Sequence, residues 1–344
     1  MSNIMLEEIK TEPEVILAAI RANESKVQAI AAEVKKRGIK NITIIGRGTS
    51  DNAGLCFKYF AEILSGMPSG TAHPSVTTMY GANVDYSGHL FVAISQSGRS
   101  IDTLAVLTQA NKQGALTVAV TNDASSPLAK AGKFHLDLSA GEERSIASAK
   151  SYIAELTVLY MLAIALSGKP LMSTVYSFPH RVEETLELLP AIQEAAEQTK
   201  DLNNFIILSR GVMQGVGKEL QLKLNECAYT FAQFYGTNDF MHGPYALVEE
   251  GVNVIILAPD GECSENFRDI ATRLQLLNAN VLTFSDNQEI LNLATYGVKM
   301  PSMDNLSCTI AYSVAMHLYA IELAKQKGKN PDAPRNLKKV TITK

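Results

Sequence analysis

The segment Val92-Ala93-Ile94-Ser95-Gln96-Ser97-Gly98-Arg99-Ser100-Ile101-Asp102-Thr103 is an apolar run that stops abruptly at small hydroxyl residues. This order predicts a strand, a loop and a helix whose first free N–H groups carry about half a positive charge, which favours phosphate binding. The loop contains no lysine, so it differs from the Gly-x-x-x-x-Gly-Lys-Ser/Thr nucleotide loop. Its hydroxyl and backbone donors suit a small monoester, such as a sugar phosphate. A plain polar turn is the alternative.

Similar apolar segments recur along the chain, and each precedes a polar turn. We expect strands at residues 41–45, 90–94, 116–120, 205–208, 254–257 and 280–284. Helical spacing between them favours right-handed βαβ units and parallel sheets. The same offset separates Ile45 from Ile207 and Ile94 from Ile256. The sequence therefore predicts two tandem α/β copies.

This repeat divides the chain into five predicted segments. They are N-terminal helices (1–34), a first α/β copy (35–168), a linker with a helical stretch at 180–199 (169–201), a second copy (202–330) and a C-terminal tail (331–344). Pro13 stands at a favourable first helical position. The tail has no strong periodicity.

Composition excludes several classes of protein. The chain has 344 residues, is 46% hydrophobic and 19% charged, and carries a net charge of −4 without a basic block. Clustered Lys and Arg are needed for non-specific nucleic-acid binding, so we expect no nucleic-acid partner. The longest apolar run, Leu156 to Leu166, is too short to span a bilayer and predicts a buried core helix, so no membrane role is expected.

The termini and cysteines add to this interpretation. The acidic start at Met1 has no signal-peptide pattern, so we expect a cytoplasmic protein. The four cysteines are scattered without a Cys-x-x-Cys pair, which argues against a zinc site or a disulfide framework.

The turns after the predicted strands of the first copy are rich in hydroxyl residues. Ligands of open parallel sheets bind beyond the carboxyl ends of the strands. In the first copy those positions hold Thr49, Ser50, Ser95, Ser97, Ser100, Ser145 and Ser148. In the second copy the serine loop is replaced by Ala258-Pro259-Asp260-Gly261. The first copy is therefore predicted to bind phosphate, and the second copy is predicted to have a different function.

The second copy contains the candidate proton-transfer residues. In the helical segment 217–227, Glu219, Lys223 and Glu226 lie roughly on one face, and this spacing alone favours a solvated face with a weak ion pair over a catalytic role. The segment 234–244 reads as an aromatic loop bounded by glycines that holds His242, a candidate for proton transfer.

Seven motifs in this order resemble the tandem SIS (sugar isomerase) proteins, in particular the isomerase half of glucosamine-6-phosphate synthase. They are Glu8-Ile9-Lys10-Thr11-Glu12-Pro13, Gly48-Thr49-Ser50, Ser95-Gln96-Ser97-Gly98, Ile146-Ala147-Ser148-Ala149-Lys150, Leu222-Lys223-Leu224-Asn225-Glu226, His242-Gly243-Pro244 and Pro334-Arg335-Asn336-Leu337-Lys338-Lys339-Val340. The resemblance covers nearly the whole chain. It implies two tandem SIS domains, each a parallel-sheet three-layer αβα sandwich of the flavodoxin-like type, with flanking helices.

The resemblance also implies roles for individual residues. Glu226 matches the glutamate that moves a proton between C1 and C2. His242 matches a ring-opening histidine, which family members contribute from a neighbouring subunit, so a homodimer is expected. Lys339 matches the tail lysine that closes over the sugar, and Lys223 matches a lysine near the glutamate. No cofactor and no metal are implied. The residues implied to bind the sugar and its phosphate are Thr49, Ser50, Ser95, Gln96, Ser97, Ser100, Ala147 and Ser148.

Departures from the family pattern bear on the substrate. Asn225 stands where the synthase has lysine, Asn238 to Met241 replace its Gly-Glu-Leu-Lys, and Arg99 stands where an acid is common. The chain begins at Met1 and enters the sugar domain directly, so we expect no glutaminase domain.

Three functions remain open at this stage. The leading hypothesis is an aminosugar-phosphate isomerase or deaminase that converts glucosamine 6-phosphate into fructose 6-phosphate and ammonia. A fructosamine-6-phosphate deglycase has the same fold and releases an amino acid instead. A non-catalytic sugar-phosphate sensor is the third possibility.

Overall fold

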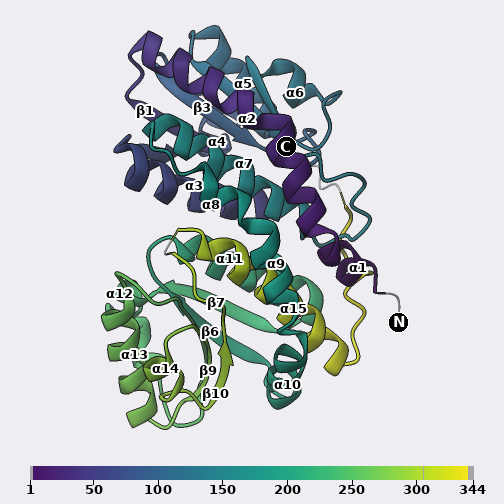
Figure 1. Ribbon diagram of the computed structural model, residues 1–344, viewed down its shortest axis with the longest axis vertical. Coiled ribbons are helices and arrows are strands. Elements are labelled where there is room, and N and C mark those ends of the chain that lie inside the picture. The colour runs from purple at the N-terminus through teal and green to yellow at the C-terminus, as the bar shows by residue number, and fades with distance from the viewer. Residues whose placement is uncertain (1–2, 305, 340–344) are drawn as a thin grey trace. The chain divides into compact units, whose positions relative to one another are not determined.

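The computed structural model of the protein (Figure 1) describes residues 3–304 and 306–339. Its internal contacts divide the chain into two compact units. The first-sheet unit comprises Thr11–Pro179 and Asn336–Lys344, and the second-sheet unit comprises Met1–Lys10 and His180–Arg335. Each unit contains one parallel five-stranded sheet, which confirms the predicted α/β class with two tandem copies.

The first-sheet unit alternates strands with helices. Its strands are β1 (Asn41–Ile45), β2 (Ser69–Thr71), β3 (His89–Ile94), β4 (Leu116–Thr121) and β5 (Phe134–Asp137). Its helices are α2 (Glu12–Arg37), α3 (Thr49–Ser65), α4 (Pro74–Thr78), α5 (Ile101–Lys112), α6 (Pro127–Ala131), α7 (Lys150–Ser167) and α8 (Met172–Tyr176). Pro13 lies in the first turn of α2, as predicted, where its missing N–H costs nothing.

The sheet order β2-β1-β3-β4-β5 places the predicted phosphate loop at a topological switch point. Ile44 pairs with Val92 and Val92 with Val118, all in parallel. The chain leaves β1 toward one side of the sheet and β3 toward the other, so the turns after these two strands diverge. Open sheets of this order bind ligands in the crevice that results. Gly48 and Ser95 are the residues of these two turns.

Helices cover both faces of this sheet, which explains why its central strands are apolar throughout. Helices α2 and α3 both pack on α7, and α5 packs against β3 and β4 (Figure 1). Phe91 and Ala93 of β3 join the core on the α5 side, together with Val106 and Leu107. Strands buried on both faces lose the alternation of polar and apolar residues.

Helix α7 contains the apolar run 156–166. It is long and apolar enough to cross a membrane by composition, yet 89% of it is buried inside the unit. The prediction of a core helix is therefore confirmed.

The second-sheet unit repeats this plan. Its strands are β6 (Asn204–Ser209), β7 (Phe231–Gly236), β8 (Asn253–Ala258), β9 (Asn280–Ser285) and β10 (Tyr296–Lys299). Its helices are α1 (Ile4–Lys10), α9 (Phe178–Leu186), α10 (Leu189–Thr199), α11 (Met213–Lys223), the π-helix η1 (Leu224–Ala228), α12 (Thr237–Met241), the 3₁₀-helix η2 (Pro244–Leu247), α13 (Ser264–Leu276), α14 (Gln288–Leu291) and α15 (Cys308–Gln326). The boundary between the units falls in the first turn of α9.

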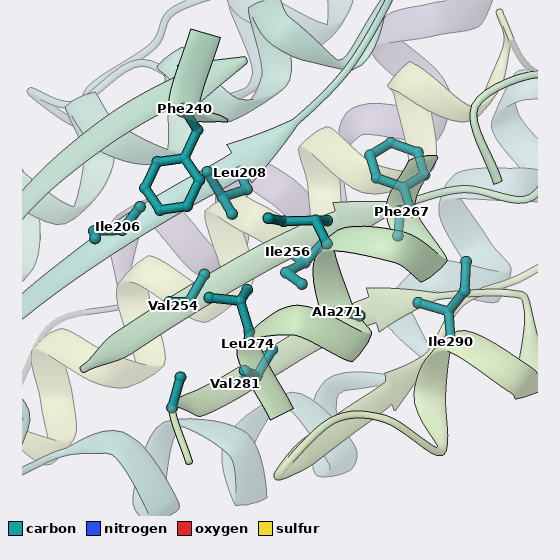
Figure 2. Packing of buried hydrophobic residues seen from close by; sticks show 13 residues of the cluster. Ile206, Leu208, Phe240, Val254, Ile256, Phe267, Ala271, Leu274, Val281 and Ile290 are labelled. Atoms are coloured by element: carbon teal, nitrogen blue, oxygen red, sulfur yellow. The ribbon is translucent and has the colours of Figure 1, made fainter. Parts of the chain in front are cut away.

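The order β10-β9-β8-β6-β7 reproduces the topology of the first sheet in a second copy. Helix α15 packs on α10 and α11, while α13 packs against β8 and β9 (Figure 1). Figure 2 shows the core under α13, where Phe240, Phe267 and Leu274 lie against the side chains of Ile206, Leu208 and Ile256. The two copies thus share one architecture, although the sequences of the turns after their strands differ.

Three local predictions need correction. The helical stretch 180–199 is two helices, α9 and α10, because Pro190 starts a new helix and prevents continuation of the first. The predicted loop 234–244 contains the end of strand β7 and the helix α12, and only its last residues are irregular. The helical segment 217–227 begins earlier, at Met213, and changes to a π-helix after Lys223.

Candidate active site

The hydroxyl loop follows β3 directly and leads into α5. The N–H of Ser95 donates to the carbonyl of Val120 at 3.0 Å, so the sheet continues to the first loop residue. Gln96 accepts from the N–H of Asn122, and Ser97 Oγ accepts from the N–H of Arg99. Gly98 has a φ of +61°, and a Cβ there would overlap the side chain of Ser126. The loop is therefore a fixed turn that only glycine permits at its tip.

An arginine that sequence reasoning missed joins this loop. Arg47, in the turn after β1, donates through Nε to Asp102 Oδ2 at 2.8 Å. Ser100 donates its hydroxyl to the other oxygen of Asp102 at 2.5 Å, and the N–H of Thr103 donates there at 2.8 Å. Burial opposes ionisation of Asp102, but the Ser100 hydroxyl and the Arg47 guanidinium lower its pKa. Asp102 thus fixes a half-exposed cation beside the start of α5.

Ser50 lies at the start of α3, and its side chain makes a buried hydrogen bond. Its hydroxyl donates to Glu155 Oε1 of α7 at 2.7 Å, and both residues are buried. Thr49, the first residue of α3, is partly exposed. Of the two residues, Thr49 is the more exposed.

The predicted tail lysine lies beside the predicted sugar-lining residues, within the first-sheet unit. Lys339 Nζ donates to Glu143 Oε2 at 2.6 Å, to the carbonyl of Ser145 at 2.7 Å and to Ser148 Oγ at 3.4 Å. Ala147, in the same turn, is buried. The tail segment 331–344 is described as far as Lys339, and residues 340–344 of this prediction lie outside the described residues.

Glu143 is the partner that positions this lysine, and sequence reasoning did not identify it. It accepts from the backbone N–H groups of Ala149 and Ser151 and from the Ser151 hydroxyl. Burial disfavours its charged form, yet the Lys339 ammonium and these donors lower the pKa of Glu143. An ionised carboxylate therefore holds the lysine at the turn that leads into α7.

Glu12 is a second buried acid in the same unit. Its side chain is fully buried, and neither carboxyl oxygen has a hydrogen-bond partner among the described residues. Burial, and then the negative charge of Glu143, raise the pKa of Glu12 well above its usual value. Burial therefore extends the protonated form of Glu12 to higher pH than for an exposed glutamate.

Glu12→Gln is expected to raise the free energy of unfolding, relative to wild type, by more at pH 8 than at pH 5. The folded state holds the proton of Glu12 to higher pH than the unfolded chain does, because burial raises the pKa of Glu12. The wild type therefore loses stability as pH rises from that ordinary pKa toward the raised one, by up to about 1.4 kcal/mol per pH unit. Glu12→Gln removes this loss. Urea unfolding at several pH values measures the difference.

The matched control is Glu14→Gln, which changes an exposed carboxylate on the same helix. A free-energy difference between Glu12→Gln and wild type that does not vary with pH would contradict the protonated state of Glu12.

Glu226 lies in the π-helix η1, in the second-sheet unit. Helix α11 is regular up to Lys223, and η1 then inserts a wider turn that ends at Tyr229 with a φ of +50°. Such π-bulges frequently occur at functional sites. The side chain of Glu226 is 21% exposed, while that of Lys223 is 1% exposed. The wider turn therefore directs a carboxylate outward beside a buried ammonium.

A buried ion chain ends at this carboxylate. Lys223 Nζ lies 2.9 Å from Glu226 Oε2 and 3.2 Å from Glu219 Oε1. Burial disfavours the ammonium, but Glu219 and then Glu226 raise the pKa of Lys223 above its ordinary value. The neighbouring Cys227 stays a neutral thiol, because burial raises its pKa to about 12. The solvated ion-pair face that spacing alone favours is therefore wrong, because Lys223 and Glu219 are 1% and 0% exposed.

His242 lies at the C-terminal end of α12, after β7. Its side chain is exposed, and its backbone N–H donates to the backbone carbonyl of Asp239 at 3.1 Å. Among the described residues, no hydrogen bond or ion pair joins His242 to Glu226. The apolar side chains of Met241 and Leu247, close to it in sequence, are 38% and 59% exposed.

A cavity of about 590 Å³ in the same unit is lined in part by the end of η1. Its lining consists of Lys200, Asp201, Asn203, Ala228, Tyr229, Gln326, Lys327, Lys329 and Arg335. Lys200 and Lys327 directly follow the C-terminal residues of α10 and α15. Cations at such ends compensate the negative end of the helix dipole, which accounts for the basic lining.

Comparisons with known proteins agree with this architecture. The SIS domain family model matches residues 35–165 and 200–324. The chain is 32% identical to the isomerizing glutamine–fructose-6-phosphate aminotransferase of Thermococcus kodakarensis, over 99% of this chain and 58% of that protein. It thus spans less than two thirds of the length of this relative.

Two solved structures share the fold. One is the C-terminal domain of glucosamine-fructose-6-phosphate aminotransferase from Francisella tularensis, with a TM-score of 0.87, 23% identity and coverage of 97% of this chain and 99% of that one. The other is glucosamine-6-phosphate deaminase from Thermotoga maritima, with a TM-score of 0.81, 22% identity and coverage of 99% and 100%. With two matched segments, each containing one parallel sheet of the same order, the chain belongs to the SIS domain family.

Proposed function

We propose that this protein is an aminosugar-phosphate isomerase that converts glucosamine 6-phosphate into fructose 6-phosphate and ammonia. The observation that carries the proposal is the Lys223–Glu226 pair: a buried ammonium 2.9 Å from a partly exposed carboxylate. A positioned carboxylate is a suitable base for a carbon acid next to a carbonyl or an imine. The names of two related proteins, an isomerizing aminotransferase and a deaminase, point to the same substrate class.

Phosphate binding is assigned to the hydroxyl loop and its neighbours. Ser95, Gln96, Ser97 and Ser100 precede α5 in the chain, and Thr49 and Ser50 begin α3 after β1. Because the Ser50 hydroxyl contacts Glu155, we propose that Ser50 contributes through its place at the start of α3 and not through this hydroxyl. The N-terminus of α5 favours an anion. Arg47, held by Asp102, adds a cation that forms charge-assisted hydrogen bonds with phosphate oxygens. We propose that Ala147 and Ser148 line the sugar carbons of the same substrate molecule.

The proposed chemistry requires one base and one water molecule. His242 assists opening of the sugar ring by proton transfer. Glu226 then removes the proton from C2 of the open-chain amino aldehyde, which yields an enolamine, and the same carboxyl returns a proton to C1. The resulting C2 imine takes up water and releases ammonia, which leaves fructose 6-phosphate. Such proton transfer supplies about 10²–10⁴-fold in rate.

Lys339 is proposed to stabilise negative charge that develops on the sugar oxygen. Fixed cations near a developing oxyanion are effective because no reorganisation is needed at the moment of reaction. Glu143 holds this ammonium beside Ser148. The arrangement supports a role for the tail in the site of the first-sheet unit.

We further propose a homodimer in which each subunit supplies His242 to its partner. The exposed apolar side chains of Met241 and Leu247 flank this histidine, and apolar surface of this kind is typical of protein contacts. In this arrangement a single subunit is inactive, because its site lacks His242.

Mixing two inactive variants tests this arrangement. Glu226→Gln and His242→Asn dimers that exchange subunits are expected to recover about one quarter of wild-type activity, because half of the mixed dimers are hybrids with one intact site. Activity assays before and after exchange measure the recovery. The single variants incubated alone serve as controls, and no recovery after verified exchange would contradict a shared site.

The experiment that tests the proposed function is a product assay with glucosamine 6-phosphate. Equal amounts of ammonia and fructose 6-phosphate would support it. Release of an amino acid from a fructosamine 6-phosphate, without turnover of glucosamine 6-phosphate, would replace it with a deglycase. Tight binding of sugar phosphates without turnover of either substrate would replace it with a sensor.

A further inference from the structure

One buried titratable residue near the proton-transfer carboxylate has no part in the mechanism above. His317 lies in the middle of α15 with a fully buried side chain. Its Nε2 is 3.5 Å from Oε1 of Glu219, which is also fully buried. Helix α15 packs on both α11 and η1, so the imidazole belongs to the same interior as the ion chain.

The contacts form a continuous series from this histidine to the surface. His317 faces Glu219, Glu219 faces Lys223 through the same oxygen, and Lys223 faces Glu226. Glu219 Oε1 is therefore shared between an imidazole and an ammonium. A positive charge gained by His317 therefore weakens the attraction between Glu219 and Lys223.

We propose that His317 is a positioning residue for Glu226: by gaining or losing a proton beside Glu219, it sets how firmly Lys223 is bound to Glu226. This inference rests on the proposed function, because it assigns Glu226 the role of base. A protonated His317 neutralises Glu219 and leaves Lys223 to pair mainly with Glu226. The carboxylate is then less available to accept a proton from carbon.

Other charged and titratable groups around α15 take part in the same electrostatic environment. They are Glu8 of α1, Glu219 and Lys223 of α11, Glu226 and Cys227 of η1, Glu322 of α15 itself and Asp332 of the tail. Asp332 accepts from the N–H groups of Ile4 and Met5, and Glu322 from Gln193 and Lys325. Helix α10 presents a hydroxyl, Thr199, to Tyr319 of α15. Of these side chains and His317, histidine is the type that ordinarily changes charge near pH 6.5.

The test compares the pH dependence of kcat/KM in wild type and His317→Gln. Glutamine keeps an N–H donor and a similar size but binds no proton. The ratio of wild-type to variant kcat/KM is expected to fall by about threefold or more as pH decreases from 8.5 to 5.5, because only the wild type acquires the imidazolium charge. A ratio that is the same at every pH would overturn the proposal, since a merely structural role changes activity without changing its pH profile.

Two further measurements separate this outcome from other failures. Tyr319→Phe removes a buried hydroxyl contact from the same helix, and its ratio to wild type is expected to be independent of pH. If His317→Gln fails to fold, as judged by circular dichroism, His317→Asn provides the same readout. Absence of turnover in the wild type would reject the proposed function itself, whereas a constant ratio with normal turnover would reject only the role of His317.

Discussion

Replacing Glu226 with glutamine is expected to lower kcat about 10²–10⁴-fold while sugar-phosphate binding is retained. Glutamine keeps the size of the side chain and can still accept from Lys223, but it cannot take a proton from carbon. The residues proposed to bind phosphate belong to the other unit and are unchanged by the substitution. Steady-state kinetics and calorimetric titration with a sugar phosphate measure the two effects separately.

Glu249→Gln is the matched control, since it removes an exposed carboxylate from the same unit. Its kinetics are expected to equal those of wild type. Wild-type turnover in Glu226→Gln would remove Glu226 from the mechanism, and simultaneous loss of binding would show that the substitution disturbs more than proton transfer.

Lys223→Met is expected to destabilise the protein by about 3–5 kcal/mol. The substitution leaves the buried carboxylate of Glu219 without the ammonium that lies 3.2 Å away, and an uncompensated buried charge is costly. Methionine fills a similar volume, so the loss is electrostatic and not a packing effect. Urea unfolding followed by circular dichroism measures it.

The double variant Lys223→Met with Glu219→Gln is expected to recover much of this loss, because the buried negative charge is removed together with its partner. Lys218→Met, at an exposed position of the same helix, provides the control. A Lys223→Met protein as stable as wild type would contradict a buried ion pair in this unit.

The strands of both sheet centres were predictable from the sequence because they are buried on both faces. The predictions for β1, β3, β4, β6, β8 and β9 agree with the structure to within about a residue at each end. Edge strands were missed because they are not buried on both faces and so lack a continuous apolar run. Strand β2 (Ser69–Thr71) is short and polar, and β7 (Phe231–Gly236) alternates exposed and buried residues that read as a loop.

The predicted site residues were found from motifs, but their partners were not. Glu143 and Lys339 are 196 residues apart in sequence, and Arg47 and Asp102 are 55 apart. Such ion pairs depend on which loops the sheet brings together, and no local pattern contains that information. The Gly46-Arg47-Gly48 turn is a signal that sequence reasoning could have used for Arg47. The π-helix at Glu226 differs from an α-helix by one inserted residue, which hydrophobic spacing does not resolve.

The central claim is that Glu226 moves a proton between C1 and C2 of a phosphorylated aminosugar. Mass spectrometry of fructose 6-phosphate formed from glucosamine 6-phosphate in deuterium oxide tests it most directly. Wild type is expected to incorporate solvent deuterium at C1 in those turnovers in which the carboxyl proton exchanges with solvent before it returns to carbon, and Glu226→Gln is expected to form this product at a rate lower by orders of magnitude. Incorporation by Glu226→Gln at the wild-type rate would contradict the account.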